Sequence, residues 1–580
     1  MKKKYWLASA FTYISPLLKE QFFTFLCIIV SSIIQQQYPL VLKIIVDDVI
    51  INQNQKMFAI MLSIYIGLFF ISFLFGFITN LMNTLNIQYF SFRIKNSLFT
   101  QLQNASMNYL HKTKIGDIVS TFNVDINTIS NFLSKNFLNM LTNIFNIIVV
   151  ISIMLMLNWQ LSFFVVLILP FFYLSILMTN GYIKGSLKNR RRLVSVFNNF
   201  LQNVFSNVIQ MKLLAGERFF KKKFLITQDN VIKTELKVTI SSSLLNQLSN
   251  LVILMGNTII IGYGVSLVFS NRLSIGGLIA FYTYMPLLFG PIRNLVTVTI
   301  QLKDFRIAFQ KILNVLDIEK ETDAEPSSLS HNRIRISGNI DFQNISFAYN
   351  DDKEPVLKNI SFCIRHGEKI AIIGRNGSGK TTLVNLLLKL YPLTNGEILI
   401  NNLNINKINN KLLRKHIGIV TQKVNFFNMS IKENYKLAFP AAKDSDIDKV
   451  CQYTGASEFI KELPEGYDTI IGESGYNFSG GQLQKLAISQ LILKDPDIII
   501  FDEATSSLDP ESIQLFYNLF TDVFKEKTVL FILHDLKRLI YADRAVLLKN
   551  GCIEREYTQN DLLNEKDIFQ ALSQEVKGSS

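Results

Sequence analysis

The stretch GRNGSGKT at residues 374–381 lies between the apolar run IAII (residues 370–373) and the helical run TTLVNLLLKL (residues 381–390). A buried strand, a glycine-rich loop and a helix in this order form the context of a phosphate-binding loop. Gly374, Gly377 and Gly379 let the backbone curl until its N–H groups point at phosphate oxygens, and the helix N-terminus adds its positive dipole end. The stretch therefore predicts a nucleoside triphosphate site in an α/β domain.

Side chains in and after this loop supply further contacts to a triphosphate. Lys380 is expected to bridge the β- and γ-phosphates, and the Thr381 hydroxyl is expected to bind Mg²⁺. The loop residues expected to hold the nucleotide are Gly374, Arg375, Asn376, Gly377, Ser378, Gly379, Lys380, Thr381 and Thr382.

A pair of acids follows a second buried strand. Asp502 and Glu503 end the apolar run at residues 498–501, so the strand delivers both carboxylates to the edge of the sheet where ligands bind. Asp502 is expected to contact Mg²⁺, and Glu503 is expected to polarise the attacking water as a general base.

The segment NFSGGQLQKLAISQLILKDPDIIIFDEATSSLD (residues 477–509) resembles the signature, Walker B and D-loop block of ATP-binding cassette (ABC) transporters. Further elements of that family follow the expected order. Tyr349 resembles the aromatic residue that stacks on adenine, Gln422 the glutamine that contacts Mg²⁺ and the attacking water, and His534 the switch histidine at the γ-phosphate. The signature residues are Ser479, Gly480, Gly481 and Gln482, the D-loop aspartate is Asp509, and residues 473–475 resemble a segment specific to exporters.

The chain departs from the family pattern at a few positions. Leu483 follows the signature where the family often has Arg, and Leu533 and Asp535 flank the switch histidine where the family has Ala and a basic residue. These departures put the fine kinetics in doubt and leave the activity in place.

The apolar residues are concentrated before residue 300. Hydrophobic residues make up 49% of the 580 residues and charged residues only 18%, which excludes a disordered chain. A membrane-spanning helix needs about 20 apolar residues. The uncharged stretches predict six spans, at 20–46, 57–82, 137–157, 160–179, 244–269 and 274–296, with breaks at Asn158-Trp159 and Asn271-Arg272.

The basic residues give the expected orientation. The loop at 83–136 carries five basic residues against two acidic ones, and the loop at 180–243 carries twelve against three. Because cytoplasmic loops are enriched in Lys and Arg, both termini and both long loops are expected in the cytoplasm of a multi-pass protein of the cell membrane. The net charge of +14 is then a topology signal, and no nucleic acid partner is expected.

We therefore predict an all-α, six-helix transmembrane domain of ABC exporter type followed by an α/β P-loop ATPase domain. The expected boundaries are 1–317 for the transmembrane domain, 318–338 for a linker and 339–580 for the ATP-binding cassette. Scattered cysteines support no disulfide framework or zinc site. Short helices that contact a cassette are expected near residues 116–124 and 213–219.

The resemblance implies a half-transporter that binds ATP and Mg²⁺ between two cassettes, so the expected partner is a second half-transporter, most simply another copy of this chain. Polar residues in the spans indicate what kind of cargo could be transported. Ser31, Gln35 and Tyr38 fall on one face of the first span; the third and fifth spans carry the asparagine stripes Asn136, Asn139, Asn143, Asn146 and Asn246, Asn250, Asn257. These amides either bond between helices or line a neutral cavity.

A neutral, amide-lined cavity would suit a peptide, and a modified antimicrobial peptide is one candidate cargo. The alternatives are a lipid flippase or multidrug exporter and, from other classes, an ATP-gated channel or sensor. A non-transport cassette ATPase acting on DNA or ribosomes is disfavoured by the six spans. Membrane lipid is an expected partner whichever cargo is transported.

Overall fold

The computed structural model describes residues 18–113, 115–318, 320–321, 337–349, 354–472, 475–505, 507–533 and 536–563. The chain forms two compact units. The helical unit contains the described residues up to Gln103 together with Ile115–Asp317, and the cassette unit contains Asn104–Lys114 and the chain from Ile318 onward. The fold class is confirmed: a helical domain is followed by an α/β domain.

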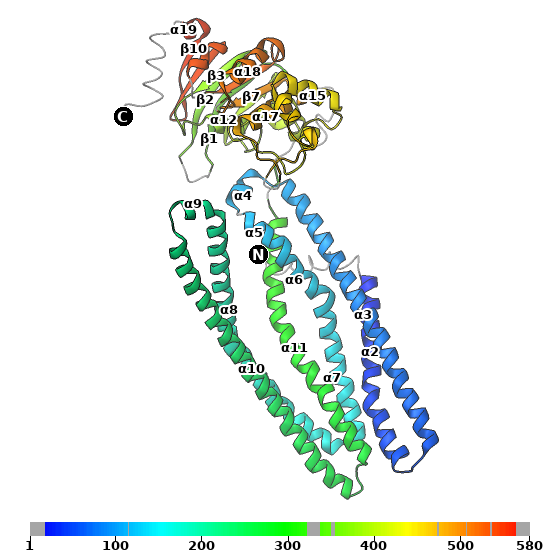
Figure 1. The fold of residues 1–580 in the computed structure, drawn as a ribbon. Helices are drawn as coiled ribbons and strands as arrows, with labels where there is room; N and C mark the ends of the chain where they lie inside the picture. The colour runs from blue at the N-terminus through cyan, green and yellow to red at the C-terminus, as the bar shows by residue number, and fades with distance from the viewer. Residues whose placement is uncertain are drawn as a thin grey trace. The chain divides into compact units, whose positions relative to one another are not determined.

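Long helices build the helical unit (Figure 1). Its α-helices are α2 (Leu18–Ile44), α3 (Gln55–Gln103), α5 (Ile115–Ser120), α6 (Ile126–Asn131), α7 (Phe137–Leu157), α8 (Trp159–Ser206), α9 (Val208–Leu213), α10 (Glu217–Phe269) and α11 (Ile275–Leu316). Three π-helical turns continue α2, α5 and α6, at Ile45–Ile50, Thr121–Asp125 and Phe132–Asn136.

Five helical stretches in the described part of the chain are long and apolar enough to cross a membrane: Leu18–Ile50, Gln55–Gln103, Ile115–Leu157, Glu217–Phe269 and Ile275–Leu316. In α8 the described apolar stretch is shorter, Trp159–Leu174. Five of the six predicted spans therefore coincide with helices that are long and apolar enough to cross a membrane, and the fourth begins in the shorter apolar stretch of α8.

Local capping ends the helices at the polar breaks in the sequence. Asn158 is extended and its side chain accepts from the Leu161 amide at 3.0 Å, which separates α7 from α8. Asn271 has φ 54°, and Ser274 then caps α11 by accepting from the Gly277 amide at 3.0 Å. Asp47 accepts from the Gly276 amide at 2.8 Å, so the end of the first span is tied to the start of α11.

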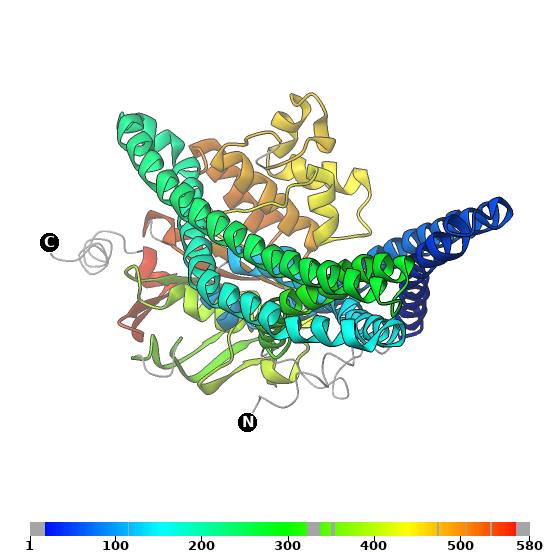
Figure 2. The same cartoon turned by 90° about the horizontal axis from the view of Figure 1, so that it is seen from below.

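The helices pack as pairs, α2 with α3 and α8 with α10, while α7 and α11 lie together. Figure 2 shows the α2–α3 pair (blue) splaying away from the α8–α10 pair (green). One apolar core joins α7, α8, α10 and α11, and a second joins α3, α6 and α11 around the stacked rings of Phe132, Phe305 and Phe309.

One residue of the polar stripes forms hydrogen bonds between helices. Asn146 of α7 accepts hydrogen bonds from Ser32 and from Gln36 of α2, the second at 3.0 Å. The Tyr284 hydroxyl of α11 donates to the Gln36 carbonyl at 2.8 Å. For Asn146, hydrogen bonding between helices is therefore the observed role.

The cassette unit contains two sheets. The six-stranded sheet has the order β10-β9-β3-β8-β7-β6, with β10 antiparallel to β9 and the other neighbours parallel. The four-stranded antiparallel sheet has the order β2-β1-β4-β5. The strands are β1 (Ile340–Phe347), β2 (Leu357–Ile364), β3 (Lys369–Ile373), β4 (Asn395–Ile400), β5 (Leu403–Asn404), β6 (Ile417–Val420), β7 (Ile498–Asp502), β8 (Thr528–Ile532), β9 (Arg544–Lys549) and β10 (Cys552–Thr558).

Helices cover these sheets and form a separate helical part before the signature. The α-helices are α12 (Lys380–Leu387), α13 (Asn410–His416), α14 (Ile431–Ala438), α15 (Asp444–Tyr453), α16 (Ala456–Lys461), α17 (Gly480–Lys494), α18 (Pro510–Asp522) and α19 (Gln559–Leu563). Ile370 and Ile372 enter the core that contains α12 and the second sheet, whereas Ala371 and Ile373 enter the core that contains α18. Because β3 is buried on both faces, its residues from Ile370 to Ile373 are all apolar.

A short segment far from the cassette in sequence belongs to the cassette unit. Ala105 forms an antiparallel bridge with Lys320, and the Glu321 amide donates to the Asn104 carbonyl at 2.8 Å. Met107 of α4 (Met107–Lys112) packs against the core of the cassette. The contact helix expected at 116–124 falls among residues that group with the helical unit, whereas α4, which precedes them, packs against the cassette core through Met107.

Candidate nucleotide-binding site

The phosphate-binding loop joins β3 to α12, as expected, and two of its glycines are required by their surroundings. Gly374 has φ 152°, and a Cβ there would meet the Leu548 carbonyl oxygen. Gly379 has φ 106°, and a Cβ there would lie 2.5 Å from Leu357 Cδ2. Both positions combine a backbone conformation that favours glycine with a lack of room for a side chain.

Lys380 begins α12 and is buried. Its Nζ donates to the carbonyls of Gly374 at 2.6 Å and Arg375 at 3.0 Å. Burial lowers the Lys380 pKa, and the nearby Glu503 and Asp502 carboxylates oppose that shift. The ammonium group is thus held at the loop that is expected to wrap the phosphates.

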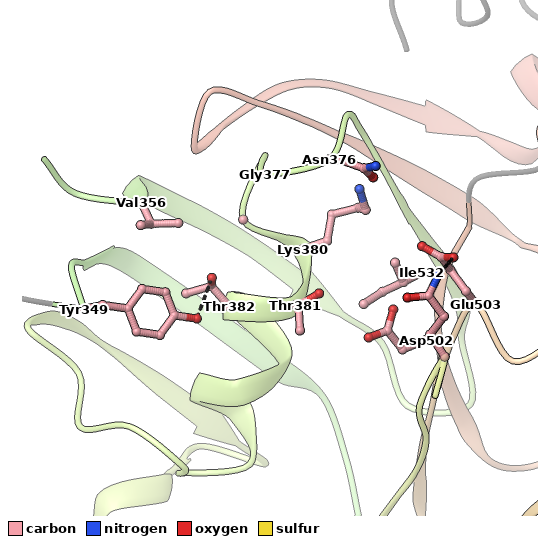
Figure 3. Close-up of a pocket in the computed structure, with 12 residues that line it drawn as sticks. Tyr349, Val356, Asn376, Gly377, Lys380, Thr381, Thr382, Asp502, Glu503 and Ile532 are labelled. Carbon is pink, nitrogen blue, oxygen red and sulfur yellow. Dashed lines mark hydrogen bonds between the residues drawn. The ribbon is translucent and has the colours of Figure 1, made fainter. Parts of the chain in front are cut away.

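A cavity of about 700 Å³ opens beside this loop (Figure 3). Most of the predicted site residues line it: Tyr349, Asn376, Gly377, Gly379, Lys380, Thr381, Thr382, Gln422, Asp502 and Glu503. Val356 and Ile532 also line the cavity and were missed, because neither carries a chemical signal in the sequence. Gly374, Arg375 and Ser378 belong to the loop without lining the cavity.

Glu503 is held in a strained conformation. Its φ is 52°, in the left-handed region that costs a residue with a side chain about 1–3 kcal/mol. Its amide donates to the Ile532 carbonyl at 3.1 Å, and its carboxylate accepts from Gln422 Nε2 at 2.5 Å. The carboxylate of Glu503 can deprotonate a water molecule beside the phosphate loop, and the amide of Gln422 can help to orient that water.

The hydroxyl of Thr381, the amide oxygen of Gln422 and the carboxylate of Asp502 share the cavity. A small, hard cation such as Mg²⁺ prefers oxygen ligands of these kinds. The Ser378 hydroxyl, one turn away on the loop, is buried without a hydrogen-bond partner in the described part of the chain. The donor set therefore fits Mg²⁺ next to an anion.

Aromatic rings extend the site on the side of Tyr349. The Tyr349 hydroxyl shares a hydrogen bond of 3.0 Å with Thr382, and its ring meets the edge of Tyr391 with centroids 5.1 Å apart. Tyr391 also contacts Phe347 and stacks on His111 of α4, with centroids 5.9 and 6.2 Å apart. Tyr391 and His111 carry no functional signal in the sequence, since only the fold brings residue 111 beside residue 391.

The signature residues lie at the start of α17, away from the cavity lining. Ser479 caps this helix: its hydroxyl accepts from the Gln482 amide at 3.2 Å, and Gln482 Oε1 accepts from the Ser479 amide at 2.9 Å. A Cβ on Gly481 would lie 2.8 Å from the Ser507 carbonyl oxygen, so the D-loop packs directly on the signature. The glycine backbone of Gly480 and Gly481 is thus presented at a helix N-terminus.

Asp509 caps α18 and does not line the cavity. Its carboxylate accepts from the Ser512 amide at 2.9 Å and from the Ser512 hydroxyl at 2.7 Å. These hydrogen bonds lower the Asp509 pKa. Arg538, which no sequence pattern marks, donates to Thr505 at the other end of the D-loop. His534 lies outside the described residues.

Known protein families match both parts of the chain. Residues 22–292 match the family described as "ABC transporter transmembrane region", and residues 357–506 match the family described as "ABC transporter". Two proteins of Staphylococcus aureus, from strains NCTC 8325 and COL, are each 31% identical over 571 residues, covering 97% of this chain and 98% of their own length. Both are named "Putative multidrug export ATP-binding/permease protein".

A solved structure has a similar fold. It is titled "Structure of a bacterial Atm1-family ABC exporter with ATP bound" and superposes with a TM-score of 0.82 at 22% identity. The match covers 96% of this chain and 98% of that chain, so the similarity of fold extends over both domains.

Proposed function

Since the chain belongs to the ABC transporter family, as a membrane-embedded half-transporter whose ATPase domain drives export, we propose that its cargo is a peptide. The observation that carries this proposal is an uncharged wall in the helical unit. Gln35 and Tyr38, from the polar face of the first span, line a cavity without any charged side chain. Peptide amides can bond to such a wall without leaving a charge unpaired.

The roles at the nucleotide follow from the cavity beside the phosphate loop. Tyr349 would stack on adenine, the loop from Gly374 to Thr382 would hold the phosphates, and Glu503 would activate the attacking water with Gln422. Thr381, Gln422 and Asp502 would hold Mg²⁺, which would neutralise phosphate charge when bound. His534 is proposed as the γ-phosphate switch.

A half-transporter of this fold works as a dimer. Ser479, Gly480, Gly481, Gln482 and Asp509 lie away from the cavity of their own chain, as a site completed by a second cassette requires. We propose that the partner is another copy of this chain, because the proposed catalytic positions are all filled in its sequence. Both composite sites would then hydrolyse ATP.

The excess of basic residues in the loops supports a cytoplasmic location for both termini and for the cassette in the cell membrane. In inside-out vesicles the cassette would face the medium, so added ATP would reach it. Protease digestion of the cassette in right-side-out vesicles would contradict this orientation.

Uptake of labelled peptides into inside-out vesicles tests the cargo. Uncharged hydrophobic peptides should accumulate only with ATP, and Glu503→Gln vesicles should accumulate none. Uptake restricted to phospholipids or cationic dyes would reject peptide export. Peptide flux that continues in the Glu503→Gln variant would indicate an ATP-gated channel.

Multidrug export is a second candidate, favoured by the names of the Staphylococcus aureus relatives. The same vesicles distinguish it: structurally unrelated drugs should then accumulate with ATP and compete with one another.

A further inference from the structure

A long groove in the helical unit runs along α3 between α2 and α11. It encloses about 710 Å³, within the range of ligand sites, and extends along α3 from Tyr65 to Asn80. The fifteen residue steps from Tyr65 to Asn80 correspond to about 22 Å of helix. The lining residues come from the predicted first, second and sixth spans, so the groove lies at membrane depth.

Aromatic rings dominate the wall of this groove. Tyr38 and Tyr65 meet with ring centroids 5.4 Å apart, and Phe69, Phe73 and Phe77 follow along one face of α3. Phe73 is 66% exposed and Phe77 is 62% exposed, so their faces are open to an occupant. Such rings favour offset or edge contacts with another aromatic group.

Polar groups interrupt the apolar wall. The side chains of Ser72 and Asn80 have no hydrogen-bond partner among the described residues, although both lie in or near the predicted second span. Pro39 has no amide hydrogen, so the carbonyl of Gln35, which also lines the groove, loses its helical donor. Polar groups at membrane depth are costly unless a partner satisfies them.

These features favour one occupant. A lipid tail would fill the apolar surface and leave the side chains of Ser72 and Asn80 unsatisfied. A cation would find aromatic faces and no carboxylate to neutralise it. A peptide carries amide donors, amide acceptors and aromatic side chains on one elongated chain.

We propose that this groove binds the uncharged, aromatic segment of a transported peptide, with Phe73 and Phe77 contacting its aromatic side chains and Asn80 bonding to its backbone. The inference rests on the proposed peptide export and names the site where the cargo binds.

Photolabelling tests the groove in the full-length dimer in lipid nanodiscs. The probe is an uncharged acetylated and amidated tripeptide that carries p-benzoylphenylalanine. Its label should map to residues 65–80 of α3. Phe73→Ala should weaken labelling about 2- to 12-fold, the range expected for loss of an aromatic pair, and Asn80→Leu should weaken it similarly.

Phe171→Ala is the matched control. Phe171 lies on α8, is 63% exposed and does not line the groove. Its loss should leave labelling unchanged. Equal labelling of the Phe73→Ala and Phe171→Ala variants would overturn the proposal, as would displacement of the probe by phospholipid or rhodamine 6G but not by unlabelled tripeptide.

Two further measurements distinguish a failure of the groove proposal from a failure of the proposed peptide export. Native mass spectrometry should find the Phe73→Ala protein dimeric; loss of the dimer would mean that the second copy fills the groove, which would overturn the proposal. ATP-dependent uptake of the same tripeptide should fall in Phe73→Ala vesicles. Equal uptake by wild type and variant would overturn the groove alone, whereas absence of uptake by the wild type would overturn peptide export.

Discussion

Replacing Tyr391 by Leu should weaken ATP binding although Tyr391 does not line the nucleotide cavity. Tyr391 is 6% exposed, and its ring contacts Tyr349 at 5.1 Å, Phe347 at 5.9 Å and His111 at 6.2 Å between centroids. Leu keeps much of the apolar contact and loses the ring. The Tyr349 ring would then no longer be fixed from the side.

The magnitude follows from the three ring contacts. An aromatic pair contributes about 0.5–1.5 kcal/mol beyond its buried area. Loss of the pair with Tyr349 should therefore raise the ATP Kd by about 2- to 12-fold. Loss of all three pairs should also lower the unfolding free energy by about 1.5–4.5 kcal/mol. Tyr391→Phe keeps the ring and should stay close to wild type in both measurements.

Isothermal titration calorimetry of the full-length protein in the Glu503→Gln background gives the ATP Kd without turnover. Inorganic tripolyphosphate serves as the matched ligand, because it contacts the phosphate loop and has no base to stack on Tyr349. Its Kd should be the same for wild type and Tyr391→Leu. Equal weakening of both ligands, or additive effects of Tyr391→Leu and Tyr349→Leu in a double-mutant cycle, would show that Tyr391 does not act through Tyr349.

Three further changes test the site and the link to the cassette. Glu503→Gln should slow steady-state phosphate release by about 10²- to 10⁴-fold with the ATP Kd nearly unchanged, as expected for loss of a general base; a retained rate would exclude that role. Gly374→Ala should abolish ATP binding, since its Cβ would meet the Leu548 carbonyl. Gly377→Ala, whose Cβ meets nothing within 4 Å, should lower the free energy of unfolding by only about 1–2 kcal/mol because its φ is 82°. Equal shifts of the thermal unfolding temperature in the two variants would contradict this difference. Glu321→Gln should lower the free energy of unfolding by about 1 kcal/mol, because Glu321 accepts from both terminal nitrogens of Arg414 at 3.0 Å in a partly exposed pair. No change in thermal unfolding would mean that this pair does not stabilise the fold.

The fold class could be predicted because its signals are local. Apolar runs mark the spans, and the alternation of buried strand, loop and helix around residues 370–390 marks the α/β domain. The residues proposed for the nucleotide site could also be named from the sequence, since Lys380, Asp502 and Glu503 each follow directly from a strand or loop pattern.

The remaining features depend on distant contacts. Nothing near residue 111 in the sequence indicates that His111 stacks on Tyr391, and the strain at Glu503 is visible only in its φ of 52°. Two neighbouring glutamines of the first span also have different surroundings that composition does not reveal: Gln36 bonds to Asn146, while Gln35, on the predicted polar face, lines the groove.

The segment 104–114 has a consequence for attempts to exchange parts between relatives. A cassette cut from the chain at residue 318 would lose the backbone partner of Lys320 and Glu321, and its core would be uncovered where Met107 packs. Tyr391 would lose its stacked neighbour at the same time. A graft that carries residues 104–114 together with the cassette keeps these contacts. A single crossover at the linker instead places the recipient's own segment 104–114 against a cassette from another protein.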